Sequence, residues 1–172
     1  AFKVVGAAAG LEEEVINRHT LLNCPGTIWL PNKFAPEDPS LAQPFHCWLN
    51  SGHGALNVVQ AIAQSCDIFF YTVAGGYKSF PGLGLPMLAY YARLFGLGSP
   101  TGIDLPGESE GLIPSEDWKR NAYGEPWVTG DTYNMAIGQG FILTPPLQML
   151  NATAAIANGG TLLRPQTVRE VR

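Results

Sequence analysis

The sequence predicts a mainly α-helical chain with one small irregular β-hairpin and one terminal edge strand. Apolar residues recur at helical spacing in several separate segments, which indicates helices with a buried face. A Pro-rich and aromatic region between Thr20 and Asn50 interrupts that pattern, and a β-type run follows the last pair of glycines. The chain has 172 residues, of which 46% are hydrophobic and 14% charged, so one domain with a substantial core is expected.

The helical pattern occupies six segments, and glycine or proline marks several of their ends. Gly75 and Gly76 close the third segment, Gly96 or Gly98 closes the fourth, and proline stands in the first turn of the sixth. The expected helices lie within residues 1–18, 55–64, 67–77, 85–99, 115–124 and 144–160. Most of the chain outside the Pro-rich region is therefore expected to form helices or to connect them.

Two β elements are expected beside the helices. Short extended runs flank a polar loop from Lys33 to Gln43, and this arrangement predicts an irregular hairpin. Residues 161–171 favour an edge strand, because Pro165 lacks the N–H that a central strand requires. The Gly- and Pro-rich loop at 100–115 is too long for a simple connection, so it is expected to be functional or tightly packed.

The charge pattern argues against two broad classes of partner. The formal net charge is -4 and no cluster of Lys or Arg occurs, so the sequence contains no basic segment of the kind that binds nucleic acid or an anionic membrane surface. No apolar run approaches the roughly 20 residues that a membrane-spanning helix needs. The chain itself is therefore expected neither to bind nucleic acid nor to span a membrane.

Three polar residues, Ser65, Cys66 and Asp67, interrupt the apolar run IAQSCDIFFY. A buried polar group without a hydrogen-bond partner costs about 1–3 kcal/mol, so the triplet predicts a functional site, a reversal of the chain, or both. A structural alternative is that Ser65 and Asp67 cap the helix that follows. The two interpretations are compatible, because a helix end beside a cleft is a rigid place to mount a hydroxyl group.

Four sequence motifs occur in this order along the chain: FKVVGAAAGLEE, SCDIFFY, TGIDLPGE and GDTYNMAIGQGFILTPPLQM. Together they resemble the transpeptidase domain of class B penicillin-binding proteins, nearest to the elongation-type penicillin-binding protein 2 group. The resemblance covers essentially the whole chain and implies the helical subdomain of a penicillin-binding, serine β-lactamase-like fold. In that family a serine in S-x-x-K attacks the D-Ala-D-Ala end of a peptidoglycan stem peptide, and penicillins acylate the same serine.

The resemblance assigns catalytic roles to Lys3, Ser65 and Asp67. Lys3 stands at the lysine of S-x-x-K, where it takes the proton of the serine; the simple alternative is a solvated lysine at a chain end. Ser65 and Asp67 match the S-x-N element, with aspartate in place of the usual asparagine. Ser65 is expected to relay a proton to the leaving amine, and Asp67 to fix the loop and accept a hydrogen bond from Lys3 or from a substrate amide.

The same resemblance implies that residues 1–172 are part of a transpeptidase domain. The serine of S-x-x-K is expected immediately before Ala1, and the K-T-G strand beyond Arg172. The full-length parent is therefore expected to be a serine-type D,D-transpeptidase of peptidoglycan synthesis and cell shape. This chain alone is expected to be inactive.

Three cysteines and a histidine predict a structural zinc site. Cys24, Cys47, His53 and Cys66 form a Cys3His set, although their C-x22-C-x5-H-x12-C spacing is wider than that of common zinc folds. The hairpin brings Cys24 near Cys47, glycines on both sides of His53 allow a close turn, and the helix within 55–64 returns Cys66 to the same end. The resemblance adds that elongation-type members sometimes hold a metal near the S-x-N loop, with varying ligand types.

Other arrangements of these side chains stay open. A Cys24–Cys47 disulfide would suit an oxidising compartment and would leave Cys66 as a small buried apolar residue. Free thiols throughout are the simplest arrangement. His46 could replace His53 as a ligand, but its place beside Cys47 in an extended run points it to the opposite face. Zinc is favoured over the disulfide, which accounts for neither the third cysteine nor the histidine.

Partners and location follow from the resemblance alone. It implies peptidoglycan stem peptides, β-lactams and the cell-elongation machinery as partners, at the extracytoplasmic (periplasmic) face of the bacterial cell membrane. Two functions of other classes compete: a non-catalytic cell-wall or partner-binding module with a structural zinc site, and a purely structural zinc-stabilised helical domain. A serine before Ala1 and a K-T-G element beyond Arg172 in the full gene would distinguish the enzyme from both.

Overall fold

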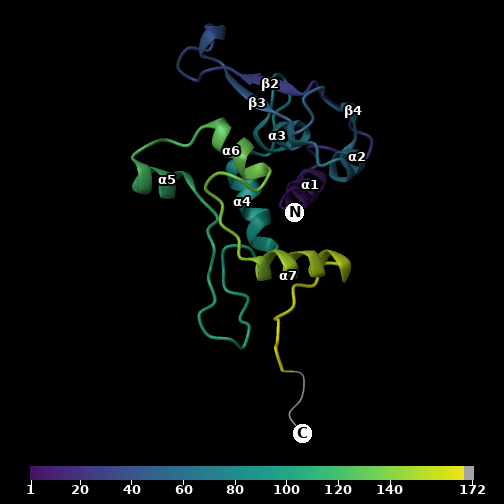
Figure 1. Cartoon of the computed structure of the whole chain (residues 1–172), viewed down its shortest axis with the longest axis vertical. Helices are drawn as coiled ribbons and strands as arrows, with labels where there is room; N and C mark the ends of the chain where they lie inside the picture. Colours follow the sequence, from purple (N-terminus) through teal and green to yellow (C-terminus); the bar gives the residue numbers. More distant parts are fainter. Residues whose placement is uncertain (169–172) are drawn as a thin grey trace.

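The structure is a computed structural model, and it describes residues 1–168. Its helices are α1 (Lys3–Glu12), α2 (Val58–Ala63), α3 (Asp67–Gly75), α4 (Gly84–Leu94), α5 (Glu116–Tyr123), α6 (Thr129–Ala136) and α7 (Pro146–Ala157), with a short 3-10 turn at Pro39–Leu41. Its strands are β1 (Leu22–Cys24), β2 (Thr27–Leu30), β3 (Gln43–His46) and β4 (Gly54–Leu56). The mainly helical class and the hairpin expected between the first two helices are both confirmed (Figure 1).

Helix α3 lies in the core because its sequence is apolar on nearly every side. Phe69, Phe70 and Val73 are each at most 1% exposed, and α3 contacts α1, α4 and α6. A helix that is apolar all round has to be covered on all sides. Burying one such side chain stabilises the fold by about 1.5–3 kcal/mol, so α3 is a rigid support for the residues at its N-terminal end.

Helix α1 is shorter than the sequence predicts. It ends at Glu12, and Glu14 then takes a left-handed backbone conformation with φ 55°. The chain folds back so that the Ile16 N–H donates to the Gly10 carbonyl over 3.0 Å. Ile16 is 2% exposed at this position. The burial of Ile16, rather than helix propensity, therefore sets the end of α1.

Two antiparallel strand pairs hold the segment that carries Cys24, Cys47 and His53. Strand β2 pairs with β3, and β1 pairs with β4 so that Cys24 lies opposite Gly54. The close approach of the chain requires glycine at position 52, where φ is +77° and an added Cβ would lie 2.2 Å from the Cys24 carbonyl oxygen. The β1–β4 pair was not predicted, because three-residue strands are too short to show alternation.

Helix α6 was not predicted either, since Thr, Gly, Asp and Asn are weak helix formers. Tertiary packing compensates for this weakness. Tyr133 is fully buried, its ring stacks on that of Tyr71 at 5.2 Å, and its hydroxyl donates to the Gly76 carbonyl over 2.5 Å. The Asp131 carboxylate accepts a hydrogen bond from the Val128 N–H, which satisfies a free donor at the start of the helix.

The prediction of a terminal edge strand is wrong for residues 161–168, which form no strand. The rest of the expected strand, residues 169–171, lies outside the described part. Thr167 donates from its N–H and its hydroxyl to the Asp104 carboxylate, over 2.8 Å each. Asn151 of α7 donates to the Leu163 carbonyl over 2.8 Å. Side chains of the long loop and of α7 thus hold this segment, and among the described residues no strand pairs with it.

Most of the long loop at 100–115 is exposed and only Ile113 and Pro114 are buried, so the expected tight packing holds only near the ends of the loop, at Gln148 of α7. Gln148 of α7 is 1% exposed and lies against the loop. Its amide nitrogen donates to the carbonyls of Ser99 and Glu110 over 2.8 and 2.9 Å, and its amide oxygen accepts from the Gly98 N–H over 3.1 Å. One buried side chain thereby satisfies loop backbone groups that would otherwise lack partners.

Candidate functional site

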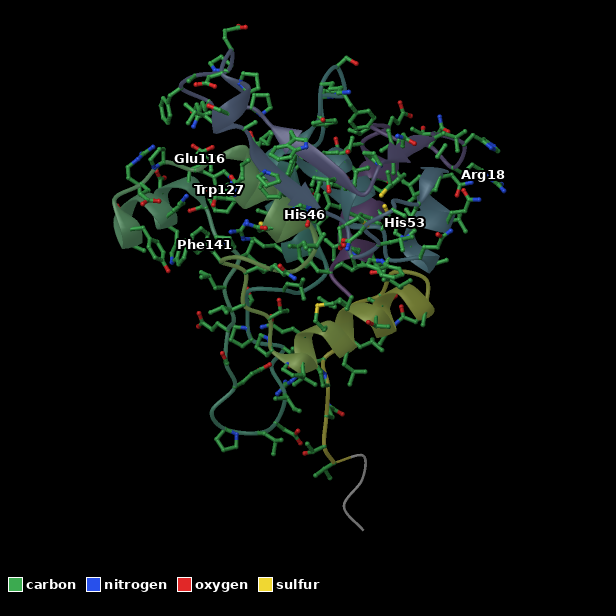
Figure 2. The ribbon with its side chains drawn as sticks, turned by 45° about the horizontal axis from the view of Figure 1, so that its top comes forward. Arg18, His46, His53, Glu116, Trp127 and Phe141 are labelled. Atoms are coloured by element: carbon green, nitrogen blue, oxygen red, sulfur yellow. The ribbon has the colours of Figure 1, made fainter. Side chains whose placement is uncertain are left out.

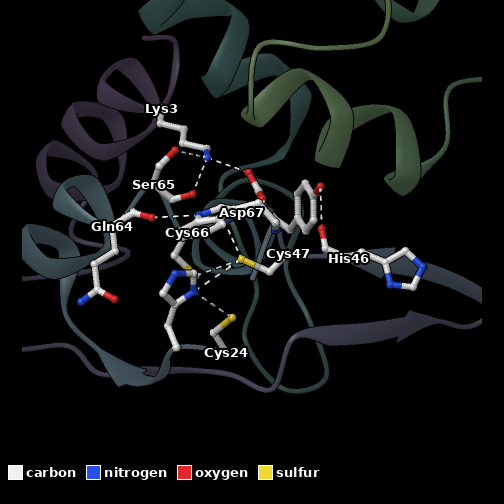
Figure 3. A network of polar contacts seen from close by, with 11 residues as sticks. Lys3, Cys24, His46, Cys47, Gln64, Ser65, Cys66 and Asp67 are labelled. Atoms are coloured by element: carbon white, nitrogen blue, oxygen red, sulfur yellow. Dashed lines mark hydrogen bonds and ion pairs between the residues drawn. The ribbon is translucent and has the colours of Figure 1, made fainter. Parts of the chain in front are cut away.

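Lys3, Ser65 and Asp67 meet at one point in the structure. Lys3 Nζ donates to Ser65 Oγ over 2.7 Å, to the Ser65 carbonyl over 2.7 Å and to Asp67 Oδ1 over 2.6 Å (Figure 3). These contacts occupy all three N–H donors of an ammonium group. The side chains of Lys3 and Asp67 are each 13% exposed, so the alternative of a solvated lysine is wrong. The catalytic roles of the three residues stay a prediction.

The local backbone explains how these residues come together. Lys3 is the first residue of α1 and Asp67 the first of α3, while Ser65 lies in the turn between α2 and α3. Ser65 has φ 51°, a left-handed conformation that a residue with a side chain rarely adopts. Cys66 is the N-cap of α3 and makes no side-chain capping bond. The alternative that Ser65 and Asp67 cap α3 is therefore wrong.

Asp67 connects three segments of the chain. Its Oδ2 accepts from the backbone N–H of Trp48 over 2.9 Å, and its own N–H donates to Cys47 Sγ over 3.3 Å. With Lys3 on the other carboxylate oxygen, Asp67 links the start of α1, the end of β3 and the start of α3. Such an arrangement can move a proton between an amine and a hydroxyl while a carboxylate keeps the amine in place.

The three residues line an open cleft of about 590 Å³. Its walls are Lys3, His46, Cys47, Trp48, Ser65, Asp67, Tyr71, Ile137 and Gln139. No functional role was predicted from the sequence for Trp48, Tyr71, Ile137 or Gln139. For Gln139 a signal was present: Gly138 and Gly140 on either side have φ values of +80° and +73°, so a tight turn presents this amide to the cleft.

Cys24, Cys47, His53 and Cys66 come together as predicted. Their ligand atoms all lie within 4.8 Å of one another. His53 Nδ1 is 3.5 Å from the Sγ atoms of both Cys24 and Cys47, and Cys47 Sγ is 4.0 Å from Cys66 Sγ. Tetrahedral zinc, with bond lengths near 2.3 Å to sulfur and 2.0 Å to nitrogen, separates its ligand atoms by about 3.5–3.8 Å. The four side chains therefore fit one tetrahedral metal ion.

His53, rather than His46, completes this ligand set. Figure 2 shows His53 beside the yellow sulfur atoms, whereas His46 lies away from them. The Nδ1 of His46 instead pairs with Thr27 Oγ1 over 3.0 Å. The expectation that the extended backbone points His46 to the opposite face is confirmed. Nδ1 of His53 faces the thiols, and its Nε2 is buried without a hydrogen-bond partner among the described residues.

The three cysteines have free thiols, each at most 2% exposed. Burial raises the pKa of the Cys66 thiol well above its ordinary value. Without a compensating charge the protonated thiol is therefore favoured, and a bound cation would reverse that preference.

Comparison with known families decides the classification. The family described as the penicillin binding protein transpeptidase domain matches residues 1–172. The chain belongs to this family. The transpeptidase match includes Lys3, the Ser65 to Asp67 turn and the cysteine cluster, so every residue of the candidate site lies within it.

Curated relatives of this chain include enzymes named peptidoglycan D,D-transpeptidase MrdA. The relative from Acinetobacter baumannii is 35% identical over 167 residues, and the one from Escherichia coli K12 is 36% identical over 159 residues. These matches cover 97% and 92% of this chain but only 23% of each relative. The chain thus spans about a quarter of the length of the curated relatives it matches.

Solved structures of penicillin-binding protein 2 (PBP2) contain the same fold as this chain. Pseudomonas aeruginosa PBP2 in complex with WCK 5153 matches with a TM-score of 0.82 and 32% identity, over 95% of this chain and 34% of that one. Helicobacter pylori PBP2 in complex with MreC matches with a TM-score of 0.80 and 33% identity, over 95% and 28%. Within residues 1–168, no helix has the length and apolar character that crossing a bilayer would require.

Proposed function

We propose that this chain is part of a serine-type peptidoglycan D,D-transpeptidase of the elongation type. One observation carries the proposal: Lys3 Nζ lies 2.7 Å from Ser65 Oγ and 2.6 Å from Asp67 Oδ1, in an open cleft. An amine, a hydroxyl and a carboxylate in contact are the groups that proton transfer in acyl transfer requires. The MrdA relatives, named for this activity, support the same conclusion.

In this proposal the parent protein carries a serine three residues before Lys3. Residues three apart share a helix face, so that serine would lie one turn from the lysine. In the structure Lys3 is an ammonium group paired with Asp67, so one of its protons must first pass to solvent. The resulting amine, still beside Asp67, accepts the serine proton while the serine oxygen attacks the carbonyl carbon of the penultimate D-Ala of a stem peptide. Ser65 then passes a proton to the departing D-Ala nitrogen and takes one from Lys3. The amine of a second stem attacks the acyl-serine ester, which frees the serine and forms the cross-link.

Asp67 has a positioning role in this scheme, because it holds the Lys3 amine in place. Its two carboxylate oxygens accept from Lys3 Nζ and from the Trp48 N–H, over 2.6 and 2.9 Å, so both are engaged inside the protein. The carboxylate holds Nζ beside Ser65 Oγ, which fixes the geometry of proton transfer before substrate binds. Asparagine, the usual residue of the S-x-N element, would lack the charge that pairs with Lys3.

We further propose that Cys24, Cys47, His53 and Cys66 hold a structural zinc ion. The Cys3His set is typical of closed structural sites, and the three cysteines are buried. When bound, zinc would supply a cross-link between β1, the end of β3 and the turn before α3. The residues that follow two of the ligands, Trp48 and Asp67, would then be fixed without themselves contacting the ion.

Partners and location are part of the proposal. Stem peptides and β-lactams are the expected ligands of the cleft, at the outer face of the bacterial cell membrane. The solved complex of Helicobacter pylori PBP2 with MreC supports a partner of the cell-elongation machinery for the parent protein.

Mass spectrometry of the full-length protein after incubation with penicillin tests the proposed function. We expect one penicilloyl adduct, on a serine three residues before Lys3. The 172-residue chain contains neither that serine nor a K-T-G element, and we expect it to remain unlabelled. A folded, zinc-loaded full-length protein without an adduct would instead favour the non-catalytic cell-wall module.

A further inference from the structure

We propose that Trp48 is a positioning residue that holds the Ser65 to Asp67 turn in its active conformation through two hydrogen bonds. The inference rests on the proposed function, because it concerns the rate at which this site is acylated. It adds a residue outside the Lys3, Ser65 and Asp67 set, at the first position after the cluster cysteine Cys47.

The turn needs an external restraint because its backbone is strained. Ser65 has φ 51°, in the left-handed region where a side chain costs free energy. Such a conformation persists only where the surrounding structure imposes it. Ser65 is also the residue whose Oγ and carbonyl both accept from Lys3 Nζ. Relaxation of this backbone would therefore move both acceptors away from the lysine.

Trp48 provides a bond on each side of the strained residue. Its indole Nε1 donates to the Gln64 carbonyl over 3.0 Å, and its backbone N–H donates to Asp67 Oδ2 over 2.9 Å. The Gln64 carbonyl belongs to the peptide group that precedes Ser65, so the indole bond restrains the peptide plane that sets this φ. Figure 3 shows Gln64, Ser65 and Asp67 along one side of the cysteine cluster, with Lys3 beyond them.

Trp48 is itself held in place by the cysteine cluster. Its ring packs edge to face against the His53 ring, with centroids 5.3 Å apart and an interplanar angle of 66°. The Cys47 Sγ, one residue earlier, accepts the Asp67 N–H over 3.3 Å. The two dipeptides Cys47-Trp48 and Cys66-Asp67 thus bond reciprocally: the first accepts from Asp67, and the second accepts from Trp48.

Burial does not account for a tryptophan at this position. Trp48 is 62% exposed, so most of its surface gains nothing from removal from water. Trp29 on β2 is similarly exposed, at 56%, but does not line the cleft, and no hydrogen bond joins its indole to another described residue. The distinguishing feature of Trp48 is its pair of N–H donors on the strained turn.

The test uses the full-length protein and a fluorescent penicillin, with the acylation rate constant and the apparent dissociation constant measured separately. Trp48 is replaced by phenylalanine and, by site-specific incorporation, by benzothienylalanine, which keeps the ring shape but lacks the N–H. Trp29→Phe is the matched control. We expect both Trp48 replacements to lower the acylation rate constant about fivefold to tenfold, the scale of one lost hydrogen bond. The dissociation constant should stay at its wild-type value, the melting temperature should fall by no more than about 2–4 °C, and Trp29→Phe should match wild type throughout.

Each other outcome overturns a defined part of this interpretation. A wild-type rate constant in the benzothienylalanine protein would overturn the role of the indole N–H. A raised dissociation constant with an unchanged rate constant would make Trp48 a ligand contact, and a marked fall in melting temperature would make it a structural residue. Absence of acylation in the wild-type protein would instead overturn the proposed function, and with it this inference.

Discussion

Lys3 Nζ and Asp67 Oδ1 lie 2.6 Å apart although 64 positions separate the two residues in the chain. Each side chain is 13% exposed, so each charge is partly removed from water and depends on the other for compensation. Ser65 Oγ lies 2.7 Å from the same nitrogen. The pair therefore contributes to stability and to the proposed chemistry, and the two contributions can be measured separately.

In the 172-residue chain, Lys3→Ala is expected to lower stability by about 1–3 kcal/mol, because it leaves a largely buried carboxylate without its cation. For a chain of this size the melting temperature should fall by about 2–4 °C per kcal/mol. Thermal unfolding followed by circular dichroism measures the change. Lys33→Ala, at an exposed loop position, is the control and should melt like wild type. Equal melting temperatures for the two variants would show that the ion pair contributes nothing to stability.

Ser65→Ala tests the proton relay in the full-length protein. Loss of the hydroxyl should lower the rate of penicillin acylation by about 10²-fold or more, the usual scale for a lost proton-transfer group. Folding should change little, because Ser65 is exposed and its backbone bonds remain. The assay is time-resolved labelling by a fluorescent penicillin. Wild-type labelling by this variant would reduce Ser65 to a loop residue without a chemical role.

His53→Ala and His46→Ala form a matched pair for the metal site. The first removes the nitrogen that lies 3.5 Å from two thiols, and the second removes a ring that bonds Thr27 instead. Elemental analysis of protein purified without chelator should find about one zinc per chain in wild type and in His46→Ala, and much less in His53→Ala. Cys66→Ser should also release zinc and lower the melting temperature. No metal in wild type, together with a single titratable thiol under denaturing, non-reducing conditions, would establish the Cys24–Cys47 disulfide.

We expect the free energy of unfolding to depend on pH in the alkaline range because of Tyr133. Burial raises the pKa of Tyr133 to about 12, against about 10 for an exposed tyrosine. The unfolded chain therefore releases this proton first, so the stability contribution is full below about pH 10 and is lost as pH rises to about 12. Urea unfolding of wild type should lose stability across this interval more steeply than Tyr133→Phe. Parallel curves for the two proteins would contradict this assignment.

The sequence predicted which polar side chains come together better than it predicted the elements that surround them. Lys3, Ser65 and Asp67 were predicted from the family resemblance that the four motifs carry. The cysteine cluster was predicted from the ligand chemistry of its side chains and from the glycines beside His53. Trp48 could not be found in this way. Its two bonds reach residues 16 and 19 positions away, and no local pattern encodes contacts at that distance.

The errors in the predicted elements have a common physical cause. Helix α6 has poor intrinsic propensity and forms because Tyr133 packs against Tyr71. The run at 161–168 has β-type residues, but such residues indicate an extended chain and not the presence of a partner strand. Helix α1 ends early because Ile16 is buried beneath it. In each case a contact between distant residues decides the outcome, and the local sequence does not contain it.

Penicillin acylation of the full-length Lys3→Ala protein tests the proposed role of the site most directly. If Lys3 accepts the proton of the attacking serine, the acylation rate should fall by about 10²–10⁴-fold, the range for loss of a general base. Lys33→Ala should be labelled at the wild-type rate, and a cooperative thermal transition should show that Lys3→Ala is folded. A folded Lys3→Ala protein that is labelled as fast as wild type would contradict the proposed mechanism.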